Sequence, residues 1–88
     1  MAITWENKAQ QHFNKIIENL PQFHRSIAQQ LVKEKAEELA QGRGPDSLVE
    51  DRDVVTAFFQ EVPPAFKDMM KRLLHQQGID YKQYISES

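Results

Sequence analysis

The amino-acid sequence predicts an all-α fold, a small bundle of four main helices with a short helical turn at the end. Apolar residues recur at spacings of three and four along most of the chain, which is typical of amphipathic helices. Prolines and glycines divide this pattern into segments that lack the alternation expected of a strand. With 88 residues, 40% of them hydrophobic, the chain has enough apolar material for one domain, residues 1–88, and too little for a second.

The first helix is expected to run from Thr4, whose hydroxyl can cap its start, to Leu20. Pro21 disfavours helical geometry at Leu20 and suits the first turn of another helix, so we expect the chain to bend there. The apolar residues of this first helix fall on one stripe: Trp5, Ala9, Phe13, Ile16, Ile17 and Leu20.

A second helix is expected from Pro21 to near Gln41. Gly42 and Gly44 follow, and glycine readily adopts the positive φ of a helix C-terminal cap. The stretch GRGPDS is therefore interpreted as a turn, from which Arg43 could contact an anionic partner. The apolar stripe expected to face the core comprises Phe23, Ile27, Ala28, Leu31, Val32, Ala36, Leu39 and Ala40.

A third helix is expected to begin near Glu50, after a short extended connector at residues 47–49, because carboxylates suit the positive end of a helix. Pro63 and Pro64 end it, and Pro64 can occupy the first position of a fourth helix. Gly78 and Ile79 are interpreted as a capping glycine with its hydrophobic contact. A last turn, capped by Asp80, is expected through Tyr84 and Ile85.

The segments described so far resemble a known family. A tryptophan-led helix is followed by LPQFHR, by VKEKAEELA with Glu37 and Ala40, and by VEDRDVVTAF. This pattern is similar to the C-terminal domain of the light-independent protochlorophyllide reductase B subunit. The resemblance covers about residues 5–59 and leaves residues 60–88 as a helical C-terminal extension. The residues that match the family motif are Trp5, Pro21, Phe23, Arg25, Val49 and Asp53.

The resemblance implies a stand-alone copy of an accessory domain. The reductase itself needs a large catalytic body, an iron–sulfur cluster and a partner subunit, whereas this chain is short and has no cysteine. We therefore expect no cofactor and no reductase activity of its own. A weaker resemblance of VEDRDVVTAF to histone-like folds implies a helical dimer as an alternative. A histone-like DNA binder should be basic, but the net charge here is −2.

Composition and charge also limit the functions to expect. An acidic chain has no global field that would attract nucleic acid or an anionic membrane, so neither is an expected partner. The start MAITWENK lacks the pattern of a signal peptide, which predicts a cytoplasmic protein. The charged residues in 46–61 are acidic apart from Arg52, whereas Lys67, Lys71, Arg72 and His75 make the next stretch basic. These stretches form either two complementary faces or ordinary solvated surface.

The residue types of catalytic and metal sites are present, but not in the patterns that such sites need. His12, His24 and His75 do not have the i,i+3 or i,i+4 spacing with which one helix presents two metal ligands. The carboxylates lack an identifiable apolar pocket, and GRGPDS lacks the lysine of a phosphate-binding loop. We therefore expect neither an enzyme nor a metal site.

Aromatic and methionine residues gather on both sides of the Pro63–Pro64 corner. They either close the core of the bundle or form a surface that binds a protein partner or a flat, tetrapyrrole-like ligand. The prediction is a non-catalytic interaction domain, as a monomer or homodimer, with apolar ligand handling as the alternative. The candidate interaction surface consists of Phe58, Phe59, Phe66, Met69 and Met70.

Overall fold

A computed structural model describes residues 3–84, and these form four α-helices and two short 3-10 turns. This confirms the predicted all-α bundle. Ile85, where the last turn was expected to end, lies outside the described residues. The elements are α1 (Asn7–Glu18), α2 (Gln22–Arg43), α3 (Asp51–Glu61), the turn η1 (Pro64–Phe66), α4 (Lys67–Gln76) and the turn η2 (Tyr81–Gln83).

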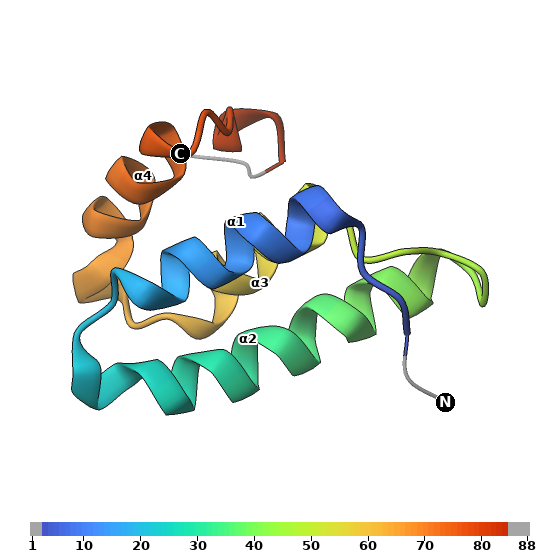
Figure 1. Cartoon of the computed structure of the whole chain (residues 1–88), viewed down its shortest axis with the longest axis horizontal. Coiled ribbons are helices and arrows are strands. Elements are labelled where there is room, and N and C mark those ends of the chain that lie inside the picture. The colour runs from blue at the N-terminus through green and yellow to red at the C-terminus, as the bar shows by residue number, and fades with distance from the viewer. Residues whose placement is uncertain (1–2, 85–88) are drawn as a thin grey trace.

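The long helix α2 forms one side of the bundle, and α1 and α3 lie against it (Figure 1). Its interface with α3 is the largest between any two of these elements. α4 contacts both α1 and α3, so the core lies where the helices meet. The largest fully buried side chains come from all four helices and from the connector before α3: Phe58, Ile16, Met70, Leu74, Val32, Val49, Val54 and Val55.

The start of the chain differs from the prediction, because Thr4 does not cap a helix. Residues 4–6 are extended and pair with the connector before α3: the Val49 N–H donates to the Thr4 carbonyl (3.0 Å), and the Glu6 N–H donates to the Val49 carbonyl (3.0 Å). These pairings give the Thr4 carbonyl and the Glu6 N–H hydrogen-bond partners outside any helix. α1 therefore begins only at Asn7. The expected extended connector is present at Val49.

The corner between α1 and α2 lies at Leu20 and Pro21, as predicted. Pro21 is extended and immediately precedes the first helical residue, Gln22. Arg25 reaches back across the corner, where its guanidinium donates to the carbonyls of Leu20 (3.0 Å) and Glu18 (2.9 Å). One cationic side chain thus satisfies two carbonyls at the end of α1, where unpaired acceptors and the helix dipole favour positive charge.

The other end of α2 lies two residues beyond the predicted end, at Arg43. Gly42 is helical, and Gly44, with φ of 148°, takes the conformation that stops the helix. Arg43 forms ion pairs with Asp53 and Glu50 and donates to the Leu48 carbonyl (2.8 Å). The expectation that Arg43 is available to an anionic partner is therefore wrong, because internal acceptors already bind it.

The remaining boundaries agree closely with the prediction. Pro64 starts a 3-10 turn, from which α4 continues at Lys67. Gly78, with φ of 76°, ends α4, and the following N–H of Ile79 donates to the Leu74 carbonyl (3.0 Å). Ile79 is buried, as expected for the hydrophobic contact of a glycine cap.

Candidate functional site

Three large apolar side chains on the first half of α2 are exposed. Phe23 is 73% exposed, Ile27 57% and Leu31 42%. They follow one another at intervals of four residues, so they share one face of the helix. We call these three residues the α2 stripe. The prediction that they face the core is wrong: α2 packs on α1 and α3 through its opposite side, where Val32, Ala36 and Ala40 are buried.

Helical geometry explains why the predicted stripe divides in two. Ile27 and Ala36 are nine residues apart, which corresponds to about 900° of rotation, so they point to opposite sides of the helix. The same relation separates Leu31 from Ala40. The sequence therefore contains a signal that was missed, namely that the apolar residues of α2 cover two opposed arcs and not a single one.

A groove of about 210 Å³ adjoins the α2 stripe. Ile27 and Leu31 contribute one wall, and the end of α3 with the chain that follows it contributes the other through residues 61–63 and Phe66. Glu61 is the carboxylate in the lining. The groove is thus apolar with an acidic residue beside it. Its lining consists of Leu20, Pro21, His24, Ile27, Ala28, Leu31, Glu61, Val62, Pro63 and Phe66.

His24 links the two walls of the groove. Its ring lies 4.5 Å from the ring of Phe23 and 4.9 Å from the ring of Phe66, with an edge-on angle of 79° to the latter. Rings at these separations attract one another beyond their apolar contact. His24 therefore packs against both Phe23 and Phe66, and these contacts set the position of Phe23 relative to the α3–α4 corner.

Two residues of the predicted family motif, Trp5 and Asp53, hold the bundle together, whereas Phe23 of the same motif is exposed. The Trp5 indole donates to the Glu37 carboxylate (2.8 Å), and its ring packs 5.1 Å from that of Phe13. Asp53 is 2% exposed, pairs with Arg43 and accepts the backbone N–H of Glu50 (2.9 Å). The hydrogen bond that the Arg43 guanidinium donates to the Asp53 carboxylate raises the pKa of Arg43 above its ordinary value, so the guanidinium keeps its charge.

The predicted aromatic and methionine surface is mostly interior. Phe58 and Met70 are fully buried, which corrects their assignment to an accessible surface. Phe59 and Met69 are half-buried and pack against the core. Only Phe66, also half-buried, lines the groove. Phe58 is covered because the ring of Phe13 lies 5.8 Å from it and because α3 contacts each of the other three helices.

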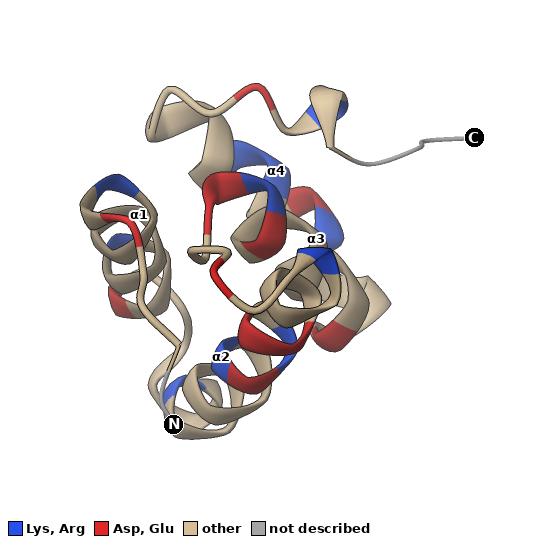
Figure 2. Cartoon of the chain, turned by 90° about the vertical axis from the view of Figure 1, so that its right-hand side faces the viewer, with Lys and Arg blue, Asp and Glu red and all other residues tan. Residues whose placement is uncertain are grey.

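Charged residues at the start of α3 also have internal partners. The carboxylate of Asp51 lies 2.9 Å from Nδ1 of His12 and 4.0 Å from Nζ of Lys8. Figure 2 shows Asp and Glu segments close to Lys and Arg segments on this side of the molecule. Within residues 3–84, no group of three or more His, Cys, Asp and Glu side chains is arranged to hold a metal ion.

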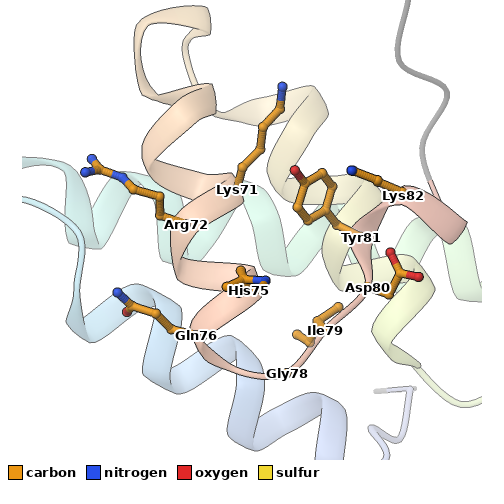
Figure 3. A pocket seen from close by; sticks show the side chains of 9 residues that line it. All are labelled: Lys71, Arg72, His75, Gln76, Gly78, Ile79, Asp80, Tyr81 and Lys82. Carbon is orange, nitrogen blue, oxygen red and sulfur yellow. The ribbon is translucent and has the colours of Figure 1, made fainter.

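A second hollow, of about 740 Å³, lies between α4 and the segment that follows it. Figure 3 shows Lys71 and His75 of α4 and Lys82 of η2 around it, while Arg72 extends from the other side of the helix. Tyr81 also lines the hollow, and its ring stacks 5.9 Å from that of Phe59. This hollow is open and basic, whereas the α2 groove is apolar.

Comparisons with known proteins find no matching family model, no matching curated protein and no matching solved structure. The family resemblance drawn from the sequence therefore stays a prediction. In the part of the chain that the structure describes, none of the helices combines the length and apolar character needed to cross a membrane.

Proposed function

We propose that this protein is a non-catalytic interaction module whose α2 groove binds an amphipathic helix of a partner protein. The exposure of the α2 stripe beside the groove carries this proposal. Phe23, Ile27 and Leu31 keep a large part of their apolar surface in water, whereas large apolar residues elsewhere in the bundle are mostly buried. A contiguous exposed apolar patch is typical of a binding surface.

The size of this surface favours a helix over the alternatives. Stable interfaces between proteins use about 20 to 30 residues on each side, and pockets for drug-sized ligands have volumes of about 300 to 1,000 Å³. The groove has about 210 Å³, which is small for a flat, tetrapyrrole-like ligand. It suits a few anchoring side chains of one helix, as in other helix-in-groove complexes.

The charge of the lining indicates which helix fits best. Glu61 lies in the groove wall, and Glu34 and Glu38 are exposed farther along α2. A partner helix with Lys or Arg beside its apolar stripe would complement these carboxylates, which raises specificity and the rate of association. An accessory role of this kind agrees with the resemblance to the C-terminal domain of the reductase subunit.

A library of helical peptides tests the proposal. The peptides carry apolar residues at i, i+4 and i+7, with Lys or Glu at the flanking positions. We expect the selected peptides to be enriched in flanking Lys. Their affinity for the Ile27→Glu variant should be at least about tenfold lower than for wild type, because the variant places a charge in the apolar contact. Gln29→Glu is the matched control, since it adds the same charge at an exposed position of the same helix.

Two results would contradict the proposal. Equal binding of the selected peptides to wild type and Ile27→Glu would mean that the α2 stripe is not the contact. A wild-type dimer in sedimentation that becomes monomeric with Ile27→Glu would assign the stripe to a second copy of the chain, as the histone-like alternative requires.

A further inference from the structure

We propose that protonation of His24 weakens the binding of a partner helix in the α2 groove, so that this interaction is strong above about pH 7 and declines towards about pH 5. The inference rests on the proposed function, because it concerns the regulation of the same groove. Three observations carry it: the place of His24 in the lining, the lack of an internal partner for its ring, and the charges around it.

His24 lies where a bound helix would cover it. Its half-buried ring lines the groove, with ring centroids 4.5 Å from that of Phe23 and 4.9 Å from that of Phe66. His24 and Glu61 are the titratable side chains that the structure describes in this lining. Histidine is the side chain whose charge ordinarily changes between about pH 5 and 8, whereas carboxylates are mostly ionised in that range. A change of pH near neutrality therefore alters the groove through His24.

The ring of His24 has no partner in the protein that would hold its charge. Among the described residues it forms no hydrogen bond and no ion pair, whereas the ring of His12 lies 2.9 Å from the Asp51 carboxylate. No buried side-chain nitrogen or oxygen in this part of the chain lacks a partner, so the ring nitrogens of His24 remain in contact with water. A helix seated in the groove would remove that water, which disfavours a charged imidazolium much more than a neutral ring.

The charges around His24 favour the neutral ring once a partner is bound. Glu61 attracts a protonated ring, but the Lys or Arg proposed for the partner helix would pair with Glu61 and repel an imidazolium. Arg25, next to His24 on α2, adds positive charge, although carbonyls at the end of α1 bind its guanidinium. The neighbouring elements contribute two exposed residues of opposite charge, Glu18 at the end of α1 and Lys67 at the start of α4.

The affinity of a selected helical peptide at two pH values tests the inference. The peptide contains no histidine, and its dissociation constant for the full chain is measured at about pH 7.5 and about pH 5.5, at constant ionic strength. We expect about tenfold weaker binding at the lower pH, which is the loss that one histidine proton produces over this range. His24→Phe keeps a ring in the groove that cannot be protonated, so its affinity should change less than about twofold. His75→Gln removes an exposed histidine outside the groove and should keep the full change.

The ring protons of His24, followed by NMR through a pH titration, give a second readout that needs no variant at this position. We expect the midpoint of the His24 titration to move to lower pH when the peptide is bound, while that of His75 stays in place.

The outcomes separate this inference from the proposed function. An affinity that does not depend on pH, a pH dependence that persists in His24→Phe, or a His24 midpoint that moves to higher pH would overturn the inference. The proposed function would still stand in these cases if Ile27→Glu weakens binding at the higher pH. Absence of peptide binding at either pH would overturn both.

Discussion

Asp53 connects two helices through one carboxylate. It accepts the backbone N–H of Glu50 at the start of α3 and pairs with Arg43 at the end of α2. Arg43 in turn donates to the Leu48 carbonyl, so the connector between the helices is held from both ends. Because Asp53 is 2% exposed, its charge needs these partners to remain in the interior.

Substitution of Asp53 by alanine tests this connection. Asp53→Ala removes the half of the α3 capping box that accepts the Glu50 N–H, and it leaves the partly buried Arg43 without its main partner. We therefore expect a loss of about 3 kcal/mol in the free energy of unfolding. Urea denaturation measures it. Asp46→Ala, at an exposed position of the adjacent turn, should leave the midpoint unchanged. An equal loss in both variants would contradict the role given to Asp53.

Among the helices, α2 shows most clearly how one element serves two purposes. Its small residues Val32, Ala36 and Ala40 let the helix lie close to the rest of the bundle. Its large residues form the α2 stripe on the opposite side, where nothing in residues 3–84 covers them fully. The largest apolar side chains in the first half of α2 therefore lie on the face of the helix that contributes less to the core.

Paired alanine substitutions on the two faces of α2 test this division. Ile27→Ala deletes more atoms than Val32→Ala, yet we expect it to cost less than about 1 kcal/mol, because Ile27 is already 57% exposed. Val32→Ala should cost about 2 kcal/mol through the cavity it leaves. Thermal unfolding of both variants gives the comparison. The reverse order of the two losses would mean that the stripe is buried in solution.

The two glycines at the end of α2 should respond to alanine with opposite signs. Gly42 is helical and has open space around its Cα, so Gly42→Ala should stabilise the protein by about 0.5 to 1 kcal/mol. Gly44 has φ of 148°, which strains any side chain, so Gly44→Ala should destabilise it by about 1 kcal/mol or more. Denaturant midpoints measure both. A stabilising Gly44→Ala would contradict the assigned helix end.

At the scale of the whole molecule, the bundle separates its core from two different concave surfaces. The apolar groove lies between α2 and the α3–α4 corner, and the basic hollow lies at the other end of α4. The helices pack large residues such as Phe58 and small ones such as Ala36 inward, and the two concave surfaces lie beside the α3–α4 corner and beside the last turn.

The sequence predicted the helices well because their boundaries depend on local chemistry. Pro21, Gly44, Pro64 and Gly78 each act within a few residues of their own position. Thr4 failed as a helix cap because its backbone pairs with Val49, which is 45 residues away in the chain. The exposure of Ile27 and the burial of Met70 were not predictable from local pattern alone, since both depend on which face of a helix its neighbours cover.

The most direct test of the central claim is a map of backbone amide shifts when a selected helical peptide binds the full chain. We predict perturbations at residues 20–31 and 61–66, on both walls of the groove, and their loss in Ile27→Glu but not in Gln29→Glu. Perturbations centred on residues 71–82, or an unchanged map in Ile27→Glu, would contradict the assignment of the α2 stripe as the interaction face.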